Sequence, residues 1–225
     1  MTLVISIFAY GITVGHYKIF PFYTLMAFKK QIIPNTSANT PTVKHTARVR
    51  LFDALTNQTD VVFLGDSITA QGLWSELFPD YTVANRGIGG DTSNGIYKRL
   101  DSIIKSNPKT VFLMLGINDI AQGVTVPDIF ERYQQIVKRL KSNNIEVVIQ
   151  STLLTNTDEL NGSVNKLNGL LKALAHKKEI VYIELNETLA HAGKLSSKVS
   201  PDGVHLYDHA YLQWRELIIN TSSLP

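Results

Sequence analysis

The sequence predicts an α/β protein built as a three-layer α/β/α sandwich. From residue 60 onward, short runs rich in β-branched residues alternate with amphipathic stretches of helical length, which is typical of a parallel sheet covered on both faces. Hydrophobic residues make up 44% of the 225-residue chain, enough to form a buried core. Because the spacing between the runs permits right-handed crossovers, we expect one doubly wound, flavodoxin-like domain with a five-stranded parallel sheet.

The predicted elements follow one another in a regular order. The strands are short apolar runs, and the helices between them carry apolar residues at helical spacing. The strands are expected at residues 61–64, 82–85, 110–115, 146–150 and 180–184. The helices are expected at residues 69–77, 94–105, 127–142, 160–177 and 206–220.

The chain before this domain divides into two parts. Residues 1–28 form an apolar segment, and residues 2–15 contain no charged side chain. Fourteen helical residues span only about 21 Å, less than the ~30 Å hydrocarbon core, so an apolar anchor followed by an interfacial helix fits better than one spanning helix. Residues 29–47 are polar and contain Pro34 and Pro41, which indicates a tether, and the domain is expected to occupy residues 48–225.

We expect the apolar segment to associate with a membrane and the domain to lie on its extracytoplasmic side. No basic residue precedes the apolar run, so a retained segment is favoured over a cleaved signal peptide. Lys29 and Lys30 favour the cytoplasmic side under the positive-inside rule. A cytoplasmic location, or a soluble protein that buries this segment, therefore remains an alternative.

Charge and cysteine content exclude several classes of function. Residues 1–50 contain six Lys or Arg and no acidic residue, whereas the remainder has 16 basic and 19 acidic residues. Because the positive charge is confined to the N-terminal arm, nucleic-acid binding is not expected. The chain has no cysteine, which excludes thiolate nucleophiles, thiolate metal sites and disulfides.

Polar segments follow the first three predicted strands and precede the last helix, at residues 65–68, 85–93, 116–119 and 200–205. The carboxyl ends of parallel strands meet at one edge of the sheet, so these segments should converge there. Ser67 follows the first strand at the start of a helix, where its hydroxyl would lie near the positive helix end, and it is a candidate nucleophile. A helix N-cap would explain the same serine.

A serine nucleophile requires a base, and histidine is the usual one. Five of the six histidines are set aside because they lie in the N-terminal arm, in polar surroundings or one turn too far along the last helix: His16, His45, His176, His191 and His209. The remaining one, His205, follows Asp202 by three residues. The carboxylate can therefore reach Nδ1 and leave Nε2 for Ser67, although a turn with a helix cap would give the same pattern.

Acyl transfer also requires donors for the developing oxyanion. Gly87, Gly89 and Gly90 let the backbone approach a ligand, and the N–H of Gly90 could point inward. Asn118 offers a neutral side-chain amide, and the Ser67 N–H is a third donor. A tight loop and an Asx-turn are the alternative explanations of these two segments.

Together these segments resemble the SGNH, or GDSL-type, hydrolase family of esterases and lipases. The matching blocks are GDSI at 65–68, NRGIGGDT at 85–92, GIND at 116–119 and DGVH at 202–205. The resemblance implies Ser67 as nucleophile, His205 as base with Asp202 as its partner, and Gly90 and Asn118 as oxyanion donors. Ile68 replaces the leucine of the family name, a change between aliphatic residues.

The glycine block and the following Arg99-Leu100-Asp101 resemble the branch related to platelet-activating-factor acetylhydrolase subunits, which implies short acyl groups. We therefore expect a serine esterase that hydrolyses short-chain carboxylic esters of a small molecule, lipid or glycan through an acyl-enzyme, without a cofactor or metal. One alternative is a non-catalytic ligand- or glycan-binding module on the same fold. Another is a metal-dependent hydrolase using Asp202, His205 and His209.

Other common α/β sites are not favoured. The Gly-x-Ser-x-Gly pattern of α/β-hydrolases is absent around Ser67. The glycines at 87–90 do not satisfy Gly-x-Gly-x-x-Gly, and no Gly-Lys-Ser/Thr follows a glycine loop. The sequence therefore gives no support for dinucleotide or nucleoside-triphosphate binding.

Overall fold

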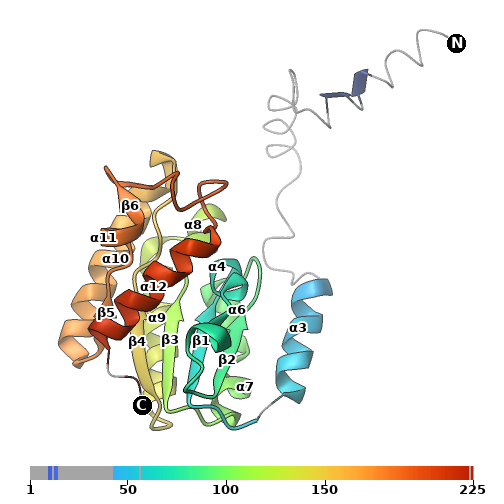
Figure 1. Ribbon diagram of the computed structural model, residues 1–225, viewed down its shortest axis with the longest axis vertical. Coiled ribbons are helices and arrows are strands. Elements are labelled where there is room, and N and C mark those ends of the chain that lie inside the picture. The colour runs from blue at the N-terminus through green and yellow to red at the C-terminus, as the bar shows by residue number, and fades with distance from the viewer. Residues whose placement is uncertain (1–9, 12, 15–42, 56, 223, 225) are drawn as a thin grey trace, which may run out of the picture. The chain divides into compact units, whose positions relative to one another are not determined.

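The computed structural model describes residues 10–11, 13–14, 43–55, 57–222 and 224. The chain forms two compact units, Met1–Pro41 and Thr42–Pro225, and the second carries the fold (Figure 1). Apart from residues 10, 11, 13 and 14, the predicted apolar segment 1–28 and the tether as far as residue 42 lie outside the described residues. Within the described ranges, no helix has the length and apolar character needed to cross a membrane.

A five-stranded parallel sheet forms the centre of the second unit. Its strand order is β2-β1-β3-β4-β5, which confirms the predicted flavodoxin-like topology. Strands β1 and β3 are buried along their whole length, as expected for continuous apolar runs covered on both faces. The strands are β1 Val61–Gly65, β2 Val83–Gly87, β3 Thr110–Met114, β4 Glu146–Gln150 and β5 Val181–Ile183.

Helices cover both faces of the sheet. On one side α9 packs against both α6 and α10, and on the other α5 contacts α12 through Trp74 and Trp214, whose ring centroids lie 4.9 Å apart. Phe63 of β1 stacks on Trp74 at 3.9 Å. The larger helices are α6 Ser93–Lys98, α7 Leu100–Lys105, α9 Val126–Lys141, α10 Asp158–Lys178 and α12 Asp208–Thr221, and the short ones are α4 Ser67–Gln71, α5 Trp74–Leu77, α8 Ile117–Ala121 and α11 Asn186–Leu189.

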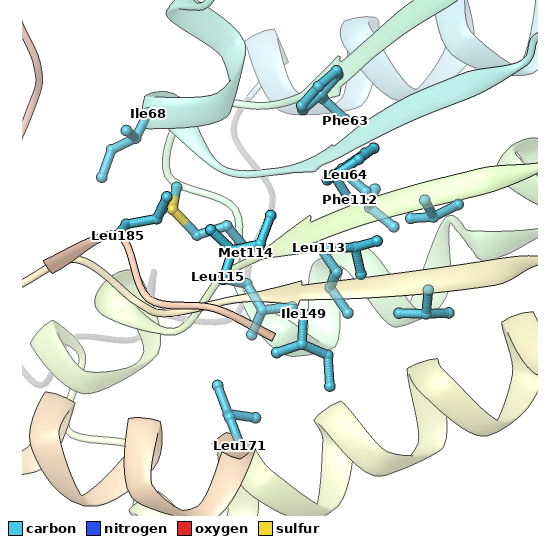
Figure 2. Packing of buried hydrophobic residues seen from close by; sticks show 14 of the residues in the cluster. Phe63, Leu64, Ile68, Phe112, Leu113, Met114, Leu115, Ile149, Leu171 and Leu185 are labelled. Carbon is cyan, nitrogen blue, oxygen red and sulfur yellow. The ribbon is translucent and has the colours of Figure 1, made fainter. Parts of the chain in front are cut away.

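The core lies between these layers. Figure 2 shows Leu171 of α10 pointing toward Ile149 of β4, while Phe63 and Phe112 lie on adjacent strands. Each of these four side chains is at most 1% exposed. Complete burial of one such side chain contributes about 1.5–3 kcal/mol. The strands are therefore held rigidly, and the loops at their carboxyl ends start from fixed positions.

Two predicted helices are interrupted. The helix expected at 69–77 begins at Ser67, because Asp66 caps it by accepting from the Ile68 N–H, and it breaks at Gly72 and Leu73. The helix expected at 94–105 is divided into α6 and α7 at Arg99, whose backbone (φ −108°, ψ 13°) is not helical. The structure also contains a small antiparallel hairpin, β6 Ala190–His191 and β7 Lys194–Leu195, that the sequence did not predict.

The boundary of the predicted tether requires correction. Residues 43–47, assigned to the tether 29–47, are the first residues of helix α3, Val43–Ala54, which belongs to the second unit. The domain therefore starts before residue 48. Phe52 is the one residue of α3 that is buried, so the helix has no apolar periodicity from which it could be predicted.

Candidate active site

The residues around Ser67 pack closely against the ends of β2 and β3, the two strands next to β1. Ser67 begins α4, directly after β1, and the preceding Asp66 accepts from the Ile68 N–H at 3.0 Å. A Cβ added to Gly65 would lie 2.5 Å from the main-chain oxygen of Met114, and one added to Gly87 would lie 2.2 Å from the Ala70 nitrogen. Only glycine permits these close backbone approaches, which fix where the Ser67 hydroxyl is presented.

Ser67, His205 and Asp202 form a continuous chain of hydrogen bonds. His205 Nε2 lies 3.0 Å from Ser67 Oγ, and His205 Nδ1 lies 2.7 Å from Asp202 Oδ2. The hydrogen bond from the imidazole, followed by smaller contributions from the backbone N–H groups of His205 and Val204, lowers the pKa of Asp202 to about 2. The carboxylate is therefore ionised at neutral pH, holds the proton on Nδ1 and leaves Nε2 to accept from the serine hydroxyl.

The loop that carries the imidazole is held largely by its own backbone. Asp202 Oδ1 accepts from the N–H groups of Val204 and His205, at 2.9 and 2.8 Å. Gly203, in the left-handed region with φ +83°, donates to Ser200 Oγ at 2.8 Å. Its carbonyl oxygen accepts from the Asn156 N–H at 2.9 Å, the contact that ties this loop to the segment after β4.

The glycine segment lies close to the nucleophile and is hydrogen-bonded to Asn118. A Cβ at Gly89 would be 4.0 Å from Ser67 Cβ, so this segment approaches the serine closely. Gly90 has φ +75° and no atom within 4 Å of its Cβ position. Asn118 Nδ2 donates one hydrogen to the main-chain oxygen of Asp91 at 2.9 Å, which leaves its second N–H for a ligand. The five predicted site residues thus lie in segments that follow β1, β2 and β3 or precede α12, and Ser67 and Asn118 occupy the first turns of α4 and α8.

A buried ionic network beneath this site was not anticipated from the sequence. Arg99 Nε donates to Asp91 Oδ2 at 2.8 Å, and Nη2 donates to the main-chain oxygens of Arg86 (2.8 Å) and Gly65 (3.2 Å). Burial lowers the pKa of Arg99, an effect that the neighbouring Asp91 carboxylate opposes. The sequence drew attention to the Arg99-Leu100-Asp101 motif. The hydrogen bonds of Arg99, however, are visible only in the folded chain, where this residue separates α6 from α7.

His45 also belongs to this network, although it had been set aside as part of the tether. Its Nε2 lies 3.0 Å from Asp91 Oδ1. The two residues are 46 positions apart, and no local motif contains both. This contact brings helix α3 to the glycine segment.

Asp66 is a second titratable group beside the nucleophile. Its side chain is buried, Oδ1 caps α4, and Oδ2 has no hydrogen-bond partner among the described residues. Burial raises the pKa of Asp66 to about 7. A large fraction of this carboxyl group is therefore neutral at physiological pH, in contrast to Asp202.

The residues of the alternative metal site are engaged elsewhere. Both ring nitrogens of His205 have partners in the Ser67–Asp202 chain, and His209 Nε2 lies 2.9 Å from the main-chain oxygen of Lys198. Across the described part of the chain, no group of three or more His, Asp or Glu side chains is arranged to hold a metal ion. The geometry gives the metal-hydrolase alternative no support.

Comparison with known proteins identifies a family and several relatives. The model of the GDSL-like lipase/acylhydrolase family matches residues 63–212. Platelet-activating factor acetylhydrolase IB subunit alpha2 of Gallus gallus is 28% identical over 171 residues, which cover 71% of this chain and 74% of that protein. N-acylneuraminate cytidylyltransferase of Streptococcus agalactiae (serotype III, strain NEM316) is 27% identical over 164 residues, 72% of this chain and 37% of that protein. The chain thus spans little more than a third of this second relative.

A solved structure shares the fold. The crystal structure of a GDSL-like lipase from Bacteroides thetaiotaomicron superimposes with a TM-score of 0.69, covering 81% of this chain and 96% of that one at 23% sequence identity. The shared architecture is the five-stranded parallel sheet with helices on both faces.

Proposed function

Because the chain belongs to the GDSL-like lipase/acylhydrolase family, we propose that it is a serine esterase that acts through an acyl-enzyme. The match confirms the predicted family, and the family's name, lipase/acylhydrolase, supports the predicted class of carboxylic ester hydrolase. The serine mechanism rests on one observation, the hydrogen-bonded chain from Ser67 Oγ through His205 to Asp202. A binding module would not need a hydrogen-bonded Ser67–His205–Asp202 triad next to oxyanion donors.

In the first half of the reaction, Ser67 Oγ attacks the ester carbonyl carbon while His205 Nε2 takes the hydroxyl proton. The carbonyl π electrons move onto oxygen, and the resulting oxyanion accepts from the N–H groups of Gly90 and Ser67 and from the Asn118 amide. Asp202 stabilises the imidazolium that forms. His205 then gives its proton to the leaving alcohol oxygen, and the acyl group stays on Ser67.

In the second half, water replaces the alcohol. His205 removes a proton from the water as it attacks the acyl carbon, and the same donors stabilise the second oxyanion. Collapse of this intermediate returns the proton to Ser67 and releases the carboxylic acid. All proton transfers use one imidazole, which takes the proton from each nucleophile and returns it to each leaving oxygen.

For the substrate, we propose a short-chain acyl ester of a lipid or a glycan. The name of one relative includes acetylhydrolase, which supports a small acyl group, and that of the other includes N-acylneuraminate, an acylated sugar acid, which supports a glycan. Turnover of p-nitrophenyl acetate, butyrate and octanoate would measure acyl length. An O-acetylated sugar and an acetylated glycerophospholipid, compared at equal concentration, would then distinguish the two alcohol classes. Faster turnover of octanoate than of acetate would contradict the short-acyl proposal.

A fluorophosphonate probe tests the mechanism directly. We expect stoichiometric labelling of the intact protein at Ser67, none in Ser67→Ala, and full labelling in Ser75→Ala, which removes a nearby exposed serine. Labelling and esterase activity should persist in a chelator. Activity that disappears with the chelator would instead support the metal-dependent alternative, and ester binding without labelling or turnover would support the binding module.

We further propose that the apolar segment 1–28 associates with a membrane and places the domain on the extracytoplasmic side. The uncharged residues 2–15 support this proposal. After carbonate washing of membranes, the full-length chain should stay in the pellet, and protease added outside intact cells should cleave it. Release into the supernatant would contradict membrane anchoring, and protection until the cells are permeabilised would place the domain on the cytoplasmic side.

A further inference from the structure

We propose that His45 on helix α3 is a positioning residue for the oxyanion donors, and that it acts through Asp91. The inference rests on the proposed esterase mechanism and extends it to a helix that precedes the family match at residues 63–212. His45 holds the Asp91 carboxylate, and the Asp91 main chain holds both donor segments. Activity should therefore depend on a residue outside the four sequence blocks.

Helix α3 contacts β2 and the junction between α6 and α7 through Phe52. The Phe52 ring is 6% exposed, and the guanidinium carbons of Arg86 and Arg99 lie 4.8 and 5.9 Å from its centroid. Arg86 Nη2 also donates to the main-chain oxygen of Leu55, just beyond α3, at 2.8 Å. Because Arg99 bonds to Gly65 as well, the same side chain contacts α3 and the end of β1.

His45 is one of the groups that hydrogen-bond to the buried Asp91 carboxylate. The Asp91 side chain is 1% exposed. Its Oδ2 accepts from Arg99, and its Oδ1 accepts from the Thr92 N–H at 2.9 Å and from His45 at 3.0 Å. A buried carboxylate that loses a donor loses much of what compensates its desolvation. We expect the Asp91 side chain to shift when His45 is removed.

The fit around this contact is close. A Cβ added to Gly95 would lie 1.8 Å from Asp91 Oδ1 and 3.5 Å from His45 Nε2. The glycine in α6 thus leaves room for the carboxylate and the imidazole together. Such packing defines a single position for the Asp91 side chain.

Movement of Asp91 would displace both Gly90 and Asn118, the two proposed oxyanion donors outside Ser67. The Asp91 N–H donates to the Ile88 carbonyl oxygen at 3.1 Å and closes the turn that contains Gly90. The Asp91 carbonyl oxygen accepts from Asn118 Nδ2 at 2.9 Å and orients that amide. Displacement of catalytic groups by about 1 Å can cost about 10²-fold in rate. A shift at residue 91 should therefore lower kcat with little effect on KM.

The test measures ester turnover in the full chain. His45→Ala should lower kcat about 10-fold or more and change KM less than about 2-fold. His45→Gln keeps an N–H donor near the position of Nε2 and should restore most of the rate. Lys44→Ala, an exposed neighbour on α3, is the matched control and should behave like the wild type. The free energy of unfolding of each variant shows whether a loss of rate is merely a loss of folded protein.

A double-mutant cycle separates positioning from general disruption. In an Asn118→Ala background, His45→Ala should cost less than it does in the wild type, because one of the two donors that it helps to position is already gone. An equal loss in both backgrounds would overturn the proposal, as would wild-type kcat in His45→Ala. If His45→Ala does not fold, His45→Phe keeps a ring without the donor, and the same two outcomes decide. Unchanged fluorophosphonate labelling of wild-type Ser67 would show that the proposed function stands even when this inference fails.

Discussion

The two halves of the active site are built in opposite ways. Ser67, Gly90 and Asn118 follow strands of the parallel sheet and are fixed by buried contacts between distant residues. The Arg99 and Asp91 side chains beneath them are 2% and 1% exposed. Asp202 and His205, in contrast, lie in one turn, with side chains 52% and 31% exposed. A donor array requires a rigid scaffold, whereas an acid–base pair can be organised within a few residues.

Asp66 and Asp202 show the same contrast. Burial raises the pKa of Asp66 to about 7, while hydrogen bonds from His205 lower the pKa of Asp202 to about 2. Identical side chains therefore differ in charge at neutral pH because one lacks solvent and the other has donors. Only Asp202 can stabilise an imidazolium throughout the physiological range.

Removal of Ser67 or His205, whose hydrogen bond connects the two halves of the site, should lower kcat more than any other change. Ser67→Ala and His205→Ala should each lower kcat by about 10⁶-fold, because the nucleophile and its base act in one step. The double variant should be little slower than either single variant. Steady-state turnover of p-nitrophenyl acetate, with binding of a substrate analogue as the control for folding, measures this. Losses that multiply in the double variant would mean that the two residues do not share a step.

Within the exposed half, Asp202→Asn should lower kcat by about 10⁴-fold, because the amide favours the wrong tautomer of His205. The free energy of unfolding at pH 7 should change little, since this side chain is largely solvated. Asp208→Asn is the matched control, an exposed aspartate that also neighbours a histidine, and should keep the wild-type rate. A rate loss of less than about tenfold in Asp202→Asn would remove Asp202 from the mechanism.

The same contrast explains which features could be predicted from the sequence. The Asp202–His205 pair is a local motif, and the five strands are continuous apolar runs, so both are visible in short windows of sequence. His45, Asp91 and Arg99 come together only in the folded chain, and His45 and Asp91 are separated by 46 positions. Sequence reasoning therefore set His45 aside and assigned no role to Arg99.

Helix boundaries set by local sequence could also be predicted, whereas those set by distant contacts could not. Helix α9 was predicted nearly to its ends because it has strong apolar periodicity and a Thr125 cap that accepts from the Asp128 N–H. The break at Arg99 could not be predicted, because this residue leaves helical geometry where its side chain bonds Gly65 and Asp91. Tertiary contacts determined this break, and the local helical pattern continues through it.

Within the buried half, Asn118→Ala should lower kcat by about 10²- to 10³-fold with little change in KM, because the amide bonds the oxyanion more strongly than the ground-state carbonyl. Asn165→Ala, an exposed asparagine on α10, is the control. Measurement of kcat and KM separately is essential here. An increase in KM at constant kcat would assign Asn118 to substrate binding instead.

Asp66 and Asp202 should change the stability of the folded chain in opposite directions as the pH rises. Between its ordinary pKa of 3.8 and its folded pKa of about 7, Asp66 keeps a proton that the unfolded chain has lost. The free energy of unfolding should therefore fall as pH rises through this window, by up to about 1.4 kcal/mol per pH unit. Asp202 acts in the opposite sense, since its contribution is lost as pH falls from 3.8 toward about 2.

Denaturant unfolding at a series of pH values from 4 to 8 would test the Asp66 contribution. Asp66→Asn can still cap α4 through its side-chain oxygen but cannot ionise, so its stability should fall less steeply with pH than that of the wild type. Asp80→Asn, at an exposed position, should leave the wild-type slope unchanged. Parallel curves for Asp66→Asn and the wild type would mean that Asp66 ionises normally in the folded chain. The difference between the two halves of the site would then be one of geometry alone, without a difference in charge.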